Sequence, residues 1–85
     1  MEAPRSNMTF EERVAYIEEN WPILLLQDNF ILSYGHSPLS INYLRKYCEE
    51  PRKHKDQLDT ICSHIYNKSR IAQQTIGQIM PLIPE

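Results

Sequence analysis

The sequence predicts an all-α protein: a compact bundle of four or five short helices in a single domain. Three observations support this. A chain of 85 residues can bury only about 60–65% of the surface of its unfolded form, which favours a compact helical core. Hydrophobic residues make up 41% of the chain and charged residues 24%, as in ordinary globular proteins. Prolines divide the chain into segments, within which apolar residues recur at helical spacing.

The helical domain is expected to span residues 9–80, between a flexible N-terminus at 1–8 and a C-terminal tail at 81–85. Its first helix would run from Thr9 to about Asn20. Thr9 and Glu12 have the spacing of a capping box, in which each side chain accepts a hydrogen bond from the other residue's backbone N–H. The buried stripe of this helix would consist of Phe10, Val14, Ile17 and Trp21.

Pro22 is expected to end the first helix or to begin the next one, because the residue before a proline is disfavoured in the helical region. Residues 23–34 are apolar almost all round. Their leucine content favours a helix capped by Gly35, and two short strands that turn at Asp28 and Asn29 are the alternative. As a helix, this segment would lie at the centre of the bundle or in a subunit interface, because it has too few polar residues for a solvated face.

A third helix is expected to start near Ser37 or Ser40 and to end at Pro51. Its inward residues would be Ile41, Leu44 and Cys48. The fourth helix has the most regular apolar stripe in the chain, formed by Leu58, Ile61, Cys62, Ile65 and Tyr66.

Residues 67–69 are expected to form a turn after the fourth helix, with Ser69 as the N-cap of a fifth helix that ends at Met80. This fifth helix carries uncharged hydrogen-bonding side chains where a solvated helix would usually carry lysine and glutamate. Glutamine can pair bidentately with adenine in the major groove, and arginine with guanine. The pattern predicts base-contacting roles for Arg70, Gln73, Gln74 and Gln78.

Residues 72–79, with the sequence Ala-Gln-Gln-Thr-Ile-Gly-Gln-Ile, resemble the recognition helix of lambdoid phage repressors and Cro proteins. In that family a small residue and one or two glutamines precede a Ser/Thr-Ile pair. The resemblance implies a helix-turn-helix in which Gln73 and Gln74 contact bases. It covers about eight residues, and upstream the chain has Arg70 where the family usually has its turn glycine.

Charge is divided unevenly along the chain. Residues 1–44 carry six acidic and two basic side chains, whereas residues 45–85 carry seven basic and five acidic ones. Lys53, Lys55 and Lys68 flank the last two helices and are the predicted phosphate contacts. So few contacts in one subunit would give modest, salt-dependent affinity. The sequence therefore predicts a small DNA-binding transcriptional regulator that acts as a homodimer on a two-fold site.

The alternative is a non-enzymatic helical module that binds a protein partner as an adaptor or regulator. The acidic first half, the net charge of -2 and the apolar segment 23–34 favour this interpretation. Gly77 is compatible with both, because a glycine inside a helix costs about 1 kcal/mol relative to alanine and suggests that another molecule approaches closely there.

Enzymatic chemistry is not expected, because the two glycines form no phosphate-binding loop and no nucleophile has a recognisable base. Cys48, His54, Cys62 and His64 do not follow zinc spacings, and both cysteines are expected in the core. No metal, cofactor or small-molecule substrate is predicted. The longest apolar run, 23–26, is too short to cross a bilayer, and no secretory signal is recognised, so an intracellular protein, cytoplasmic or nuclear, is expected.

Overall fold

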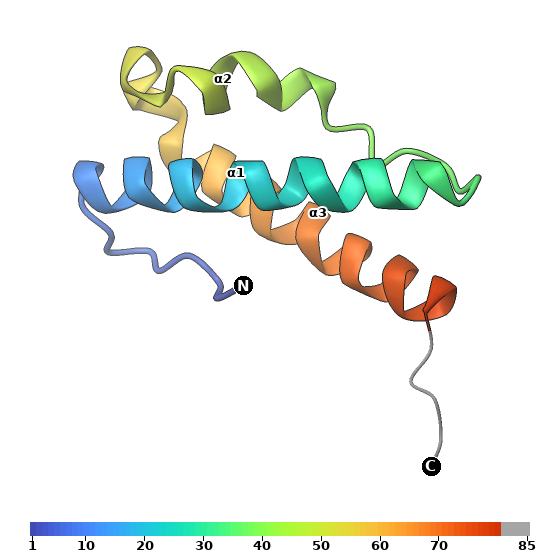
Figure 1. Cartoon of the computed structure of the whole chain (residues 1–85). Helices are drawn as coiled ribbons and strands as arrows, with labels where there is room; N and C mark the ends of the chain where they lie inside the picture. Colours follow the sequence, from blue (N-terminus) through green and yellow to red (C-terminus); the bar gives the residue numbers. More distant parts are fainter. Residues whose placement is uncertain (81–85) are drawn as a thin grey trace.

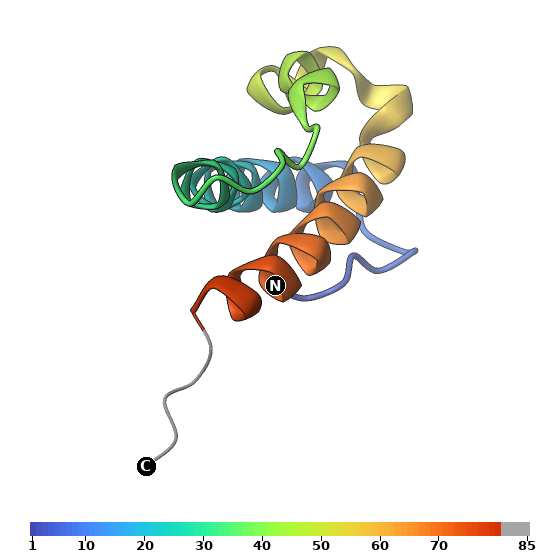
Figure 2. The same cartoon turned by 90° about the vertical axis from the view of Figure 1, so that its right-hand side faces the viewer.

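The computed structural model of the chain describes residues 1–80, which form three α-helices joined by irregular segments and short 3-10 turns. The helices are α1 (Phe10–Ser33), α2 (Arg45–Glu49) and α3 (Leu58–Ile79). The long helices α1 and α3 cross each other, and α2 with its flanking turns lies along one side of α1 (Figure 1, Figure 2). The all-α prediction is confirmed, with three helices in place of the predicted four or five.

Pro22 lies inside α1, so the predicted break between the first two helices is wrong. A proline in a helix interior has no N–H for the carbonyl four residues earlier and costs about 3 kcal/mol. Trp21 and Leu24 lie on either side of Pro22 and are only 5% and 0% exposed. Burying each such side chain is worth about 1.5–3 kcal/mol, which offsets the proline, while Pro22 itself is exposed to solvent.

The capping box at the start of α1 is confirmed. The backbone N–H of Thr9 donates to the Glu12 carboxylate at 2.9 Å, and the Glu12 N–H donates to the Thr9 hydroxyl at 3.1 Å. The N-terminal segment runs beside this end of the helix, where the Tyr16 hydroxyl donates to the Glu2 carbonyl at 2.8 Å. Side-chain and backbone partners therefore fix the first turns of α1.

The segment 23–34 is helical, as its leucine content predicts, and the alternative with two strands is excluded. Gly35 follows the helix with a φ of 79°, and its N–H donates to the Leu32 carbonyl at 3.0 Å. The His36 N–H donates to the Ile31 carbonyl at 3.2 Å, which completes a Schellman motif. The predicted glycine cap is confirmed.

The third helix starts later than expected. Residues 36–41 are irregular, a 3-10 turn spans Asn42–Leu44, and α2 is only five residues long. Two further 3-10 turns, Pro51–Lys53 and Lys55–Gln57, lead into α3. The predicted inward residues of this part, Ile41, Leu44 and Cys48, are all buried.

Residues 67–69 lie inside α3, so the predicted turn, and with it the helix-turn-helix, is wrong. Asparagine, lysine and serine each cost less than about 0.7 kcal/mol in a helix. Ser69 is 1% exposed, between the buried Ile65 and Ala72, and its hydroxyl lies 3.5 Å from the Gln27 side-chain oxygen of α1. Ser69 is therefore a small residue at a helix contact and not an N-cap.

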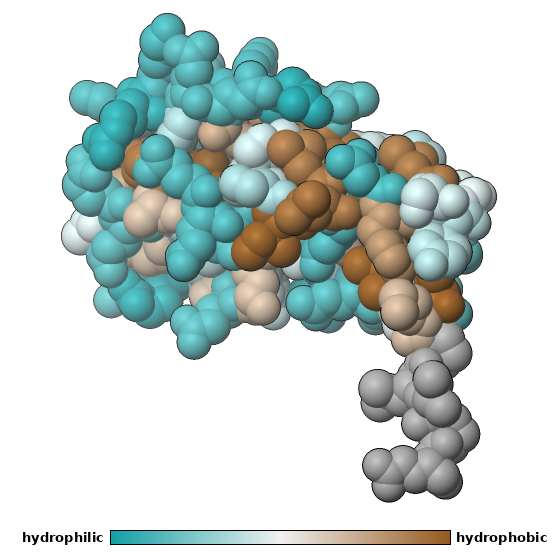
Figure 3. Space-filling view, viewed as in Figure 1, coloured by the Kyte–Doolittle hydropathy of each residue, from teal (hydrophilic) through white to brown (hydrophobic). Residues whose placement is uncertain are grey.

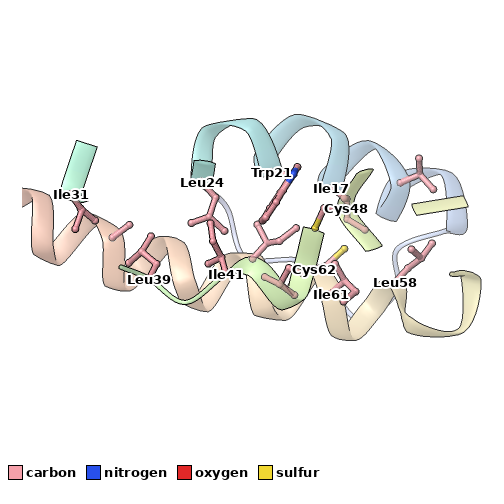
Figure 4. Close-up of a cluster of buried hydrophobic side chains, with 14 residues drawn as sticks. Ile17, Trp21, Leu24, Ile31, Leu39, Ile41, Cys48, Leu58, Ile61 and Cys62 are labelled. Carbon is pink, nitrogen blue, oxygen red and sulfur yellow. The ribbon is translucent and has the colours of Figure 1, made fainter. Parts of the chain in front are cut away.

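A single apolar cluster joins the three helices (Figure 4). Both cysteines belong to it as free thiols, as predicted, and burial raises the pKa of Cys48 to about 12 and that of Cys62 to about 11. Thiols with such pKa values are protonated at neutral pH and weakly reactive. The cluster consists of Val14, Ile17, Trp21, Leu24, Ile31, Leu39, Ile41, Leu44, Cys48, Leu58, Ile61, Cys62, Ile65 and Ala72.

Candidate functional site

The side chains predicted to contact bases are all exposed on the second half of α3. Arg70, Gln74 and Gln78 lie on the side of α3 away from the buried Ser69 and Ala72, whereas Gln73 lies next to Ser69, four residues further along the helix. Gly77 lies between them, and a methyl group added there would meet no atom within 4 Å. Packing within residues 1–80 therefore does not require a glycine at this position.

The lysines predicted to contact phosphate are not gathered around this face. Lys53 and Lys55 precede the start of α3 at Leu58, and Gln73 lies fifteen residues further along, or about 22 Å at 1.5 Å per residue. The Lys53 ammonium forms a salt bridge of 2.6 Å with Glu50. The Lys55 ammonium lies 5.6 Å from the centroid of the Phe10 ring.

Lys68 is half-buried and lines a shallow groove between α3 and the segment 36–40. It lies on the other side of α3 from Gln73, because two residues separated by five positions are about 140° apart around a helix. The structure therefore spreads the four predicted base contacts over about 140° of the α3 surface, places Gln78 in the same groove as Lys68, and leaves Lys53 and Lys55 elsewhere.

A second candidate surface lies on the outward side of α1. Ile23, Leu26, Phe30 and Tyr34 follow one another at intervals of three or four residues and form one row, which we call the α1 apolar row. Ile23 is 45% exposed, Leu26 69% and Tyr34 57%. Phe30 is half-buried, and its ring centroid lies 4.9 Å from that of Tyr34. At 1.5 Å per residue the row is about 16 Å long.

No charged side chain accompanies this row on the second half of α1. The exposed residues of 22–34 are Pro22, Ile23, Leu26, Asn29, Leu32, Ser33 and Tyr34. The one charged residue there, Asp28, is half-buried and accepts a hydrogen bond of 2.8 Å from the Leu39 N–H. In Figure 3 apolar surface gathers over the middle of α1 and towards the end of α3, while the side that holds the start of α1 is hydrophilic.

The first half of α1 is acidic instead. Glu11 forms a bidentate salt bridge with Arg52 at 2.8 and 2.9 Å, and the hydrogen bond from Arg52 lowers the pKa of Glu11. Glu12 pairs with Arg5 at 2.6 Å. Glu18 and Glu19 are exposed and form no salt bridge within residues 1–80. The acidic half therefore ends in two carboxylates without a salt bridge, four and three residues before Pro22.

The sequence indicated that residues 23–34 were too apolar to be solvated, but it did not separate an inward from an outward face. Only a helix that continues through Pro22 fixes the rotation that buries Leu24 and Ile31 and exposes Leu26. The signal that could have found the outward face was the spacing of Ile23, Leu26 and Phe30.

Within residues 1–80 no cluster of three or more His, Cys, Asp or Glu side chains is placed to hold a metal ion. No helix among these residues is long and apolar enough to cross a membrane. No protein-family model, curated protein or solved structure matches the chain.

Proposed function

We propose that the chain is a non-enzymatic protein-interaction module that binds its partner through the α1 apolar row. The observation that carries this proposal is the 69% exposure of Leu26 at the centre of a continuous row without charge. Contiguous exposed apolar patches on small soluble domains mark interaction sites. Burial of such surface contributes roughly 25 cal/mol per Å² to association.

The row is also held rigidly, which favours binding. Leu24 and Ile31 anchor the same stretch of α1 from the inward side, and both are 0% exposed. The Schellman motif around Gly35 fixes the end of the helix. A partner would therefore meet a preformed helix face and would not have to order it, so less conformational entropy is lost on binding.

DNA binding by α3 is the second candidate, supported by the exposure of Arg70, Gln73, Gln74 and Gln78 on one helix. A single helix can enter the major groove with its exposed side. This candidate is weaker for two reasons. Residues 67–69 are helical, so the separate helix that would precede the recognition helix and cross the DNA backbone does not form within residues 1–80. Lys53 and Lys55, two of the predicted phosphate contacts, lie far from the glutamines.

Site-specific photo-crosslinking in cells that express the protein separates the two candidates. A photoreactive amino acid replaces Leu26 in one variant and Gln74 in the other, both at exposed positions. We expect position 26 to give a discrete protein adduct that disappears when Phe30→Asp is added. DNA adducts from position 74, with no protein adduct from position 26, would contradict the proposal and favour the second candidate.

A further inference from the structure

An open cavity of about 490 Å³ lies between the N-terminal segment and the two long helices. Residues of the segment 4–8 form one wall, α1 contributes one side chain, and the first half of α3 forms another wall. Small-molecule sites usually have volumes of about 300–1,000 Å³. The polar side chains that α1 and α3 contribute to the cavity are Arg13, Asp59, Thr60, Ser63, His64 and Asn67.

Arg13 is the basic group that α1 places in this cavity. Its side chain is half-buried, and the only hydrogen bond of its guanidinium within residues 1–80 goes to the Ser6 carbonyl oxygen at 3.3 Å. It forms no salt bridge among these residues, whereas Arg5, Arg45 and Arg52 each do. Because a guanidinium carries five N–H donors, most of the donors of Arg13 remain available to a ligand.

Three uncharged donors face the cavity from successive turns of α3. Thr60, Ser63 and Asn67 are three and four residues apart, so they share one side of the helix. None of their side chains forms a hydrogen bond within residues 1–80. The Ser33 and Thr75 hydroxyls, which lie elsewhere, donate to backbone carbonyls of their own helices. The donors that line the cavity are therefore left for solvent or a bound molecule.

A fourth group on the same side of α3 is the imidazole of His64, four residues after Thr60. Its ring is half-buried, and its Nδ1 lies 2.8 Å from the Tyr43 hydroxyl. When Nδ1 accepts this hydrogen bond, Nε2 carries the proton and is a donor. Tyr43 thus holds the ring in place while one nitrogen remains unused.

We propose that this cavity binds the phosphate group of a small organic phosphate. Guanidinium groups bind phosphate through two parallel N–H donors, and Arg13 has donors available for this geometry. A phosphate ester has three further acceptor oxygens, one more than a carboxylate has. The hydroxyl and amide groups of α3 supply single donors of the kind that these remaining oxygens need.

Asp59 indicates what the rest of the ligand carries. It is the one acidic residue that lines the cavity among residues 1–80, it is exposed, and it lies one turn before Ser63. A carboxylate accepts hydrogen bonds only, so it repels a phosphate placed against it and accepts hydrogen bonds from hydroxyl groups. A phosphate ion alone is also much smaller than the cavity. The expected ligand therefore has a phosphate at one end and hydroxyl groups at the other, as a sugar phosphate has.

An NMR titration of the labelled full chain tests this proposal with ribose 5-phosphate, ribose and inorganic phosphate as probes. We expect ribose 5-phosphate to bind with a Kd of about 1 mM or below, when added to about 10 mM. The amides of residues 4–8 and 60–67 should move most. Inorganic phosphate should bind at least about threefold more weakly, and ribose should cause no shifts, because the Arg13 guanidinium has no anion to bind.

Two matched pairs of variants locate the site. Ser63→Glu places a carboxylate in the cavity and should weaken the binding of ribose 5-phosphate at least about tenfold. Its control, Gln74→Glu, adds the same charge about three turns further along α3 and should change the Kd by less than about twofold. Arg13→Gln should also weaken binding at least about tenfold, whereas Arg45→Gln makes the same change in net charge on α2 without this effect.

Circular dichroism checks that each variant is folded, and Ser63→Glu, at an exposed helix position, decides the question if Arg13→Gln is unfolded. Equal binding of inorganic phosphate and ribose 5-phosphate would overturn the proposed class of ligand. An absence of shifts with every probe, or binding that Ser63→Glu leaves unchanged, would overturn the site itself. The proposal does not rest on the α1 apolar row, so none of these results alters the crosslinking test of the proposed function.

Discussion

The two halves of α1 share one helix and one core but present different surfaces to solvent. On the inward side they are alike, since Ile17 in the first half and Leu24 in the second are both 0% exposed. On the outward side the first half carries glutamates, whereas the second half exposes Ile23 and Leu26 and no charge. Folding needs the inward residues of both halves, so the outward apolar residues of the second half are left for another role.

The second half of α3 offers a further contrast. Its exposed residues are mostly amides around Gly77, with Arg70 as the one charged side chain and Ile71, 48% exposed, as the one large apolar side chain before the helix end. Amides remain solvated when exposed, whereas exposed leucine and isoleucine gain free energy only when a partner covers them. The comparison favours α1 over α3 as the principal interaction surface.

The largest expected effect is on the free energy of unfolding, and it distinguishes the inward from the outward side of α1. The same substitution, leucine to alanine, is made once on each side. Leu24→Ala should lower the free energy of unfolding by about 2–5 kcal/mol, because it leaves a cavity in the core. Leu26→Ala should change it by less than about 0.5 kcal/mol, because the side chain is exposed. Urea denaturation followed by circular dichroism measures both, and a comparable loss in the two variants would mean that Leu26 is buried.

The boundary between the two halves can be tested by removing its proline. Pro22→Ala restores an N–H donor for the Glu18 carbonyl within α1, so we expect the free energy of unfolding to rise by about 1–3 kcal/mol. Thermal denaturation checks this. A fall in stability would indicate that Pro22 begins a separate helix and that α1 is not continuous.

The contrast with α3 is tested at Gly77. A Cβ at this position has open space, so Gly77→Ala should raise the free energy of unfolding by about 1 kcal/mol through helix propensity alone. Chemical denaturation measures the change. If the added methyl group instead abolishes crosslinking from position 74, α3 has a partner that approaches its backbone closely, and the preference for α1 would need revision.

The smallest expected effect is a pH dependence in the acidic half. The N–H of Thr9 and then the Arg5 guanidinium lower the pKa of Glu12 below its ordinary 4.5. A lowered pKa in the folded state stabilises the protein above the unfolded pKa, and this contribution is lost as the pH falls through the folded pKa. The difference in Tm between the wild type and Glu12→Gln should therefore be constant above about pH 5 and shrink towards pH 3. A difference that does not change with pH would contradict this account.

Local patterns in the sequence predicted most of the secondary structure, because they depend on residues within one or two turns of each other. The capping box of Thr9 and Glu12, the Gly35 cap and the stripe from Leu58 to Ile65 all have this local origin. Pro22 and Ser69 misled the prediction because their local preferences favour helix ends. In the fold, the free energy gained by burying the residues on both sides of Pro22 and Ser69 outweighs those local preferences.

The candidate site was only partly predictable. The sequence identified 23–34 as too apolar for a solvated helix, and it identified the uncharged side chains of 70–78. It named Lys53 and Lys55 as phosphate contacts because they flank the last two predicted helices, which were separated by a turn at 67–69. With α3 continuous, a rise of 1.5 Å per residue carries Gln73 about 22 Å from the start of the helix.

The sequence by itself determined that this protein is all-α, where its first helix begins and which residues near Cys48 and Ile61 are inward. These features follow from helical periodicity and capping, which act over a few residues. Tertiary structure decided that residues 1–80 form three helices in place of the four or five predicted, and that Leu24 is buried while Leu26 is exposed. The physical reason is that packing between α1 and α3 contributes more free energy than the local costs of Pro22 and Ser69, and this packing sets the rotation of each helix.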